Sequence, residues 1–200
     1  MPGLNASEIR VAGTGSLFVA PAHTAAPADF TKDWAAPWVN LGYTSSDGVK
    51  FVKKDKLDPV DTWQSVAAIR YVFSDRDFSV KFSLLQINSD TMTFFFSSPA
   101  PATPNVYNID AAPRVDERAL GIEFSDGPTV KHRFYIPRGV VTETDETSVT
   151  RTAAIKLGIT FTALTPIKDN KFEPLAQWSM NTAAPAAVAE TEPETEEQPA

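Results

Sequence analysis

Apolar and polar side chains alternate along several short segments of this chain, and this alternation constrains the fold more than any other feature. It is clearest in residues 67–74 and 78–85, and it returns in residues 120–125, 130–136 and 155–162. Successive side chains of a β-strand point to opposite faces of the sheet, so a period of two residues indicates strands with one apolar face. The sequence therefore predicts a mainly β fold, an antiparallel β-sandwich or barrel.

Turn residues predict how these strands are connected. Asp47-Gly48 predicts a hairpin between residues 38–43 and 49–52, because Asp-Gly favours tight turns. The short polar segment 75–77 predicts antiparallel pairing of the strands on either side of it. Pro59 is expected to prevent a long strand, so that residues 53–64 leave the sheet. Pro137 is expected to end the strand at residues 130–136. Further strands are expected at residues 16–20 and, as an edge strand, at 172–180.

Residues 86–96 break the alternation and predict one α-helix flanking the sheet. Ile87, Thr91 and Phe94 or Phe95 recur at helical spacing. Asn88 or Ser89 is suited to cap the first turn, because a short polar side chain can accept a hydrogen bond from a free backbone N–H there.

The residues offer little for catalysis. The chain has no cysteine, which excludes disulfides, thiolate metal sites and a cysteine nucleophile. His23 lies in a loop rich in proline and alanine, and His132 falls on the apolar phase of a strand, which favours a core position. The carboxylate clusters 75/77, 116/117 and 143/145/146 are best interpreted as solvated turns. We therefore expect no enzyme activity, no cofactor and no metal site.

The net charge of −7 is concentrated at one end of the chain. Residues 181–200 contain five glutamates and no base, so the remaining 180 residues carry 20 acids against 18 bases. The last segment, rich in Ala, Pro, Glu and Thr, is expected to be disordered. The nearly neutral body argues against tight binding to nucleic acid, which requires a basic face. No segment has the length or composition of a membrane span or a signal peptide, so synthesis in the cytoplasm is expected.

Residues 38–49 read W-x-x-L-G-Y-x-x-x-D-G-V. This segment follows a strand and an Ala/Pro loop, and it precedes further strands and a helix. In both respects the chain resembles the major tail tube proteins of long, non-contractile-tailed bacteriophages, with a likeness that extends over roughly residues 10–165.

The resemblance implies a structural subunit of the virion that is made in the host cytoplasm and assembles with itself. It implies hexameric rings that stack into a tube, through which DNA passes without sequence-specific binding. Other tail proteins, such as the tape measure and the tail terminator, would be partners, and no membrane is implied. Residues 1–15 would form an N-terminal arm, 16–180 the β domain with an extended inter-ring loop at 44–66, and 181–200 the acidic tail.

Two sets of residues are candidates for roles in such a tube. Contacts between rings are expected from Lys50, Lys53, Lys54, Lys56 and Trp63 in the 44–66 loop. Side chains facing the channel are expected from the polar phases of the strands, at Arg70, Lys81, Glu123 and Ser125. Two alternatives remain open: a phage surface or receptor-binding module that forms no tube, and a hydrolase that uses Asp75 or Asp77.

Overall fold

The computed structural model describes residues 4, 8–99, 101–112, 114–168 and 171–181. One antiparallel sheet of eight strands dominates it, with one short helix, and the sheet does not close into a barrel. This confirms the predicted mainly β class. The elements are β1 (Thr14–Pro21), β2 (Val39–Asn40), β3 (Lys50–Thr62), β4 (Ser65–Leu84), α1 (Ser89–Phe96), β5 (Arg118–Asp126), β6 (Val130–Thr144), β7 (Leu157–Ala163), β8 (Ile167–Lys168), β9 (Lys171–Phe172) and β10 (Gln177–Asn181).

Strand β6 belongs to both halves of the sheet, because its partners change along its length. Its residues before Pro137 pair with β5 on one side and β10 on the other. Gly139 pairs with both β5 and β7, and the residues after it pair with β7. We call β2, β1, β5, the first part of β6 and β10 the β1 half-sheet. The β3 half-sheet consists of β3, β4, β7 and the last part of β6. The strand does not end at Pro137, as the sequence had predicted, but continues to Thr144.

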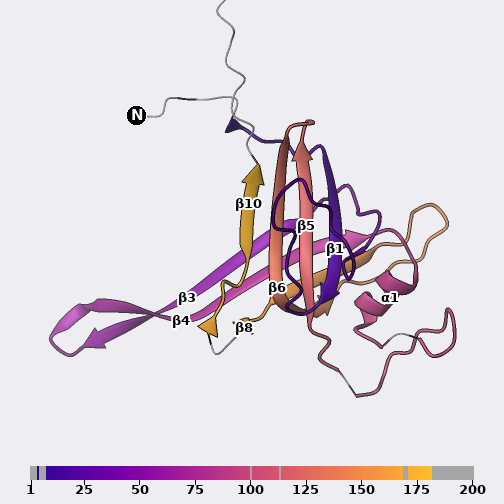
Figure 1. Cartoon of the computed structure of the whole chain (residues 1–200). Coiled ribbons are helices and arrows are strands. Elements are labelled where there is room, and N and C mark those ends of the chain that lie inside the picture. Colours follow the sequence, from indigo (N-terminus) through magenta and orange to yellow (C-terminus); the bar gives the residue numbers. More distant parts are fainter. Residues whose placement is uncertain (1–3, 5–7, 100, 113, 169–170, 182–200) are drawn as a thin grey trace, which may run out of the picture.

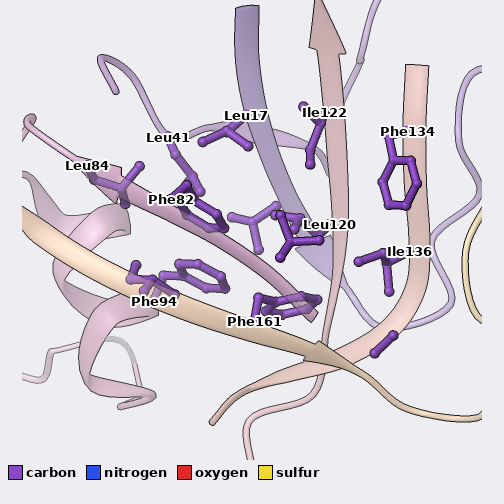
Figure 2. Packing of buried hydrophobic residues seen from close by; sticks show 14 of the residues in the cluster. Leu17, Leu41, Phe82, Leu84, Phe94, Leu120, Ile122, Phe134, Ile136 and Phe161 are labelled. Carbon is purple, nitrogen blue, oxygen red and sulfur yellow. The ribbon is translucent and has the colours of Figure 1, made fainter. Parts of the chain in front are cut away.

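The core lies between the two half-sheets, and Figure 2 shows its side chains converging from both. Val80, Phe82 and Leu84 of β4 are buried, as their alternation predicts. They meet residues of the β1 half-sheet such as Leu17 and Ile122. Burial of these side chains removes apolar surface from water and is the main source of stability.

Helix α1 covers one end of this core and confirms the predicted helix, although it begins three residues later than residue 86. Asn88 is the N-cap: its side chain accepts a hydrogen bond from the backbone N–H of Thr91, 2.9 Å away. The Thr91 hydroxyl accepts one in return from the backbone N–H of Asn88, at 2.9 Å. Phe94 then packs on Phe82 and Phe161, with ring centroids 6.5 and 5.9 Å apart.

Strands β3 and β4 form a long hairpin that projects from the body as a two-stranded arm (Figure 1). The prediction that residues 53–64 leave the sheet was wrong: they continue β3 up to Thr62. Residues 75–77 are likewise not a turn but lie inside β4. Pro59 is tolerated because β4 is the only described strand that pairs with β3, so the missing N–H interrupts no second described ladder.

A β-bulge explains why β4 appeared to be two strands in the sequence. Lys56 pairs with Asp75 and Leu57 pairs with Phe73, so Ser74 is an extra residue with no partner opposite it. A bulge shifts the alternation of one strand by one residue. The apolar residues of β4 therefore have odd numbers before Ser74 and even numbers after it, and both sets lie on the same face of the hairpin.

The predicted hairpin between residues 38–43 and 49–52 was also wrong. A turn does form at Asp47-Gly48, where Gly48 has a φ of +69° and its N–H donates to the carbonyl of Ser45, 3.0 Å away. The flanking segments do not pair, however. Val39 and Asn40 pair with β1, and β3 pairs with β4. The turn therefore carries the chain from one half-sheet to the other.

The outer face of the β1 half-sheet is covered by residues 21–38, and the two tryptophans of this loop lie against it. Trp34 stacks on Phe18, with centroids 5.1 Å apart, and Trp38 meets Tyr135 edge-on at 6.1 Å. Gly121 is required beneath Trp34, because an added Cβ would lie 2.4 Å from the indole ring. The predicted edge strand at 172–180 is present as β10. Residues 182–200 of the predicted acidic tail, and residues 1–3 and 5–7 of the predicted N-terminal arm, lie outside the described residues.

Candidate assembly surfaces

The arm formed by β3 and β4 presents an apolar face. Because residues paired across an antiparallel ladder share a face, Leu57 lies beside Phe73 and Pro59 lies beside Tyr71. Ile69 has the same phase as Tyr71 and Phe73. All five side chains are exposed, with Tyr71 at 61% and Phe73 at 63%. Monomeric proteins rarely expose a contiguous apolar surface of this kind, which usually marks an interaction site.

This apolar face continues the core-facing side of the sheet. Phe51 pairs with Val80 inside the body, and the residues of β3 with the same phase lead through Lys53 and Asp55 to Leu57. Because of the bulge at Ser74, the apolar residues of β4 stay on the same face as those of β3 over this distance. The arm is therefore a strand pair whose apolar side is covered by the β1 half-sheet near the body and by no described residue farther out.

A charged cluster separates the core from the apolar face of the arm. Asp55 accepts hydrogen bonds from Arg76, at 2.7 Å from Nε and 3.3 Å from Nη2, and Lys53 Nζ lies 2.9 Å from its carboxylate. The hydrogen bond from Arg76, and next that from Lys53, lower the pKa of Asp55. These contacts pair charges on the inner face of the hairpin, where the body no longer covers it.

A second surface is the outer face of the β3 half-sheet, which is polar. Lys81 lies between Lys50 of β3 and Thr160 of β7, and Ser79 pairs with Thr162 in the next row. Neither lysine forms an ion pair with a described residue. Two like charges directly opposite each other destabilise a strand pair, so the subunit maintains this pair at some cost.

Two edges of the β3 half-sheet have no neighbouring strand in the described part of the chain. Strand β3 pairs only with β4, and beyond Gly139 β6 pairs only with β7. The free edge of β3 is rich in charge: of its 13 residues, Lys50, Lys53, Lys54, Asp55, Lys56, Asp58 and Asp61 are charged. Free edges are available for pairing with another chain, and charged side chains restrict which chain can do so.

The structure places the predicted inter-ring residues along one strand and its tip. Lys50, Lys53, Lys54 and Lys56 lie on β3, and all but Lys53 are on its outer face. Trp63 lies at the tip of the arm. Their predicted contacts involve other copies of the chain and remain predictions. Sequence reasoning missed the strand that carries them. The two-residue tip Trp63-Gln64, between paired Thr62 and Ser65, has none of the glycine, asparagine or aspartate residues that mark tight hairpin turns, so no local signal in the sequence identified it.

The predicted channel-facing residues lie in three different places. Lys81 is on the outer face of the β3 half-sheet, and Arg70 is on the arm. Ser125 hydrogen-bonds Thr14, with 2.8 Å between the hydroxyl oxygens. Glu123 accepts hydrogen bonds from the indole of Trp34 and from the guanidinium of Arg133, a side chain that is 4% exposed. The fold thus brings Lys81 next to Lys50 and does not bring the four candidates together.

The histidines have no arrangement typical of catalysis. His132 is buried, as predicted, stacks on Phe124 and accepts a hydrogen bond at Nδ1 from Trp178, 3.3 Å away. Within the described ranges no group of three or more His, Cys, Asp or Glu side chains could hold a metal ion. Among the described helices, none combines the length and the apolar character that a membrane crossing requires.

Comparison with known proteins assigns the chain to a family. The family model for phage tail tube protein matches residues 2–190, nearly the whole chain. The chain belongs to the phage tail tube protein family. It is therefore a structural subunit of the tube in a phage tail and not an enzyme. A comparison with curated proteins gives no significant match.

Membership in this family gives the exposed surfaces a context. A tail tube protein functions in the virion as an assembly of many subunits, so surfaces left uncovered in one subunit have other subunits as available partners. The resemblance found from residues 38–49 is confirmed at the level of the phage tail tube family.

Proposed function

We propose that this phage tail tube protein forms hexameric rings that stack into the tube of a long, non-contractile tail and conduct DNA during infection. The observation that carries the proposal is the arm, whose apolar face is in phase with the core but is covered by no described residue. A second copy of the chain would supply the missing cover. Tape measure and tail terminator proteins would be further partners of the assembled tube.

The β3 half-sheet is the surface best suited to line the channel. Its inner face supplies Val80 and Phe161 to the core, and its outer face carries lysine, serine and threonine. Its two edges, at β3 and at the last part of β6, are open to neighbours. Joining unlike edges is a head-to-tail contact, which closes into a ring when the rotation between subunits permits.

The charge of the body supports a conduit rather than a binding groove. Residues 1–180 carry 20 acids and 18 bases. A strongly basic wall would neutralise phosphates and retain DNA by releasing its counterions. A nearly neutral subunit with polar side chains on the channel face would allow DNA to pass.

Negative-stain electron microscopy of the purified full chain tests the proposal. We expect tubes or stacked rings with a central hole. The matched control replaces residues 54–77 with Asn-Gly, a two-residue turn that can join the paired residues Lys53 and Phe78. This shortened protein should fold and remain monomeric. Monomers from the full chain under all conditions, or tubes from the shortened chain, would contradict the proposal.

A further inference from the structure

A cavity of about 320 Å³ opens between the start of β1 and the segment that leads into β3. Its apolar lining includes Leu17 of β1, Ile122 and Phe124 of β5, and Val49 and Phe51 beside the turn. Gly13 also lines the cavity and contributes no side chain. The cavity is therefore partly open and lined mainly by apolar side chains.

The cavity exists because the sheet is not closed at this position. Strand β1 pairs with β2 only at Phe18 and Val19, and the N–H of Leu41 donates to the carbonyl of Leu17, 2.9 Å away. On the other side, Thr44 forms a bridge to Leu84 of β4. Between these two edges no described strand fills the gap.

A side chain that fits such a hole is present elsewhere in the chain. Trp63 lies at the tip of the arm and is 99% exposed, and Val66 beside it is also fully exposed. Tryptophan is the residue type most enriched at the energetic centres of protein interfaces, because it buries a large rigid surface. Within one subunit, this side chain has no cover from any described residue.

Trp63 cannot occupy the cavity of its own subunit. Phe51, which lines the cavity, lies near the start of β3, and Trp63 lies twelve residues later, just after the end of this strand. At about 3.3 Å per residue, an extended strand of that length places Trp63 about 40 Å from Phe51. The β3–β4 ladder pairs Lys50 to Thr62 with β4, despite a bulge at Ser74 and a second register shift after Val60, and this pairing holds the arm extended over that distance.

We infer that Trp63 of one copy inserts into the cavity beside Leu17, Val49 and Phe51 of a second copy. This inference rests on the proposed tube and names the surface that receives the arm. Each subunit then carries one projecting group and one receiving hole, placed at different positions. Such a contact is head-to-tail and extends from copy to copy, as a stack of rings requires.

Photo-crosslinking tests the contact. Trp63 is replaced by p-benzoylphenylalanine, an aromatic residue of similar bulk, and the assembled protein is irradiated and digested for mass spectrometry. We expect intermolecular adducts on residues 12–17 or 44–51. Assembled tubes with adducts only elsewhere would overturn the inference and leave the proposed function intact, whereas failure of the unmodified chain to assemble would overturn both.

The reciprocal experiment places the photoreactive residue at Thr44, on the wall of the cavity. We expect adducts on residues 60–66 of another copy, and only in assembled protein. Adducts on residues 1–7 in isolated subunits would show that the N-terminal segment occupies the cavity instead, and would overturn the inference.

Filling the cavity gives a test that does not depend on crosslinking. In Gly13→Phe the new Cβ would lie 3.7 Å from the carbonyl oxygen of Ser125, an ordinary contact, so the fold should tolerate it. We expect the concentration needed for assembly to rise at least tenfold, as for Trp63→Ser, with an unchanged melting temperature. Ser148→Phe, in an exposed loop, is the control and should assemble normally. Normal assembly of Gly13→Phe would contradict the inference.

Discussion

Leu57 and Phe73 lie directly opposite each other on the arm, and both side chains are exposed, at 45% and 63%. They share the face of the hairpin that carries Phe51 and Val80 into the core. The arm therefore continues the apolar side of the sheet past the point where the β1 half-sheet covers it. Assembly with another copy is the physical reason we propose for this arrangement.

The first prediction concerns the two faces of the arm. Phe73→Ser should raise the concentration needed for tube assembly by about tenfold or more, because large side chains at the centre of an interface contribute more than 1 kcal/mol. The free energy of unfolding of the isolated subunit should fall by no more than about 1 kcal/mol, since the exposed side chain loses only its cross-strand contact with Leu57 and the Arg76 guanidinium 5.8 Å from its ring. Val72→Ser, on the opposite face, should assemble normally. Sedimentation velocity and thermal unfolding would measure both, and equal effects of the two substitutions would exclude a one-sided contact.

The second prediction concerns Lys50 and Lys81, which are paired with each other across β3 and β4. Lys81→Gln removes a like-charge pair and should stabilise the isolated subunit by about 0.2–1 kcal/mol. Added salt should reduce this difference, because it screens exposed charges. Lys54 is paired with Asp77, so Lys54→Gln should give no stabilisation. Chemical unfolding at low and high salt measures this difference, and equal stabilisation by both variants would show that the pairing is irrelevant.

The third prediction concerns salt and the lysines of β3. If Lys50, Lys53, Lys54 and Lys56 meet acidic groups of the next ring, the fraction of assembled protein should fall as salt increases. Replacing all four with glutamine should remove most of that dependence. Light scattering across a salt series is the measurement. Assembly that does not respond to salt would refute these ionic contacts but not the apolar contact of the arm.

The fourth prediction concerns Glu123, which was a candidate for the channel. Glu123→Ala leaves the buried guanidinium of Arg133 without its carboxylate and should destabilise the subunit by about 3 kcal/mol, at the low end for a buried pair because Glu123 is itself 21% exposed. Glu143→Ala, at an exposed position, should change stability by less than about 0.5 kcal/mol. Thermal unfolding of the isolated subunits measures both. A stability loss below 1 kcal/mol for Glu123→Ala would support an exposed role for this side chain instead.

The fifth prediction concerns alkaline pH. Burial, and secondarily the charge of Glu173, raise the pKa of Tyr135 from 10.0 to about 12. The folded state therefore holds this proton more tightly than the unfolded state does. The contribution of Tyr135 to stability should be complete below pH 10 and should be lost as pH rises from 10 to about 12. Unfolding measured across this range should show that Tyr135→Phe lacks this loss, and an identical pH dependence in the two proteins would contradict the assignment.

Local features of the sequence predicted local structure well. The alternation of Phe78 to Leu84 identified a buried strand face, and Asn88 was available as a cap for α1. Both depend on residues close together in the chain, whose physical preferences act within a few positions. The family resemblance likewise came from one continuous segment, residues 38–49.

Features that depend on distant residues could not be predicted in this way. Ile69 to Phe73 alternate as cleanly as Phe78 to Leu84 do, yet the first set is exposed and the second is mostly buried. The period shows that a face is apolar but not whether the same chain or another copy covers it. Asp75–Asp77 has the composition of a turn, and only the pairing with β3 shows that it lies within a strand. The approach of Lys50 to Lys81 depends on that same pairing.

A cryo-electron microscopy reconstruction of the assembled protein tests the central claim most directly. We predict six subunits per ring, with Leu57, Tyr71 and Phe73 of each arm buried against another copy. Rings in which these three side chains remain exposed to solvent would contradict the claim that the arm is completed by a neighbouring subunit.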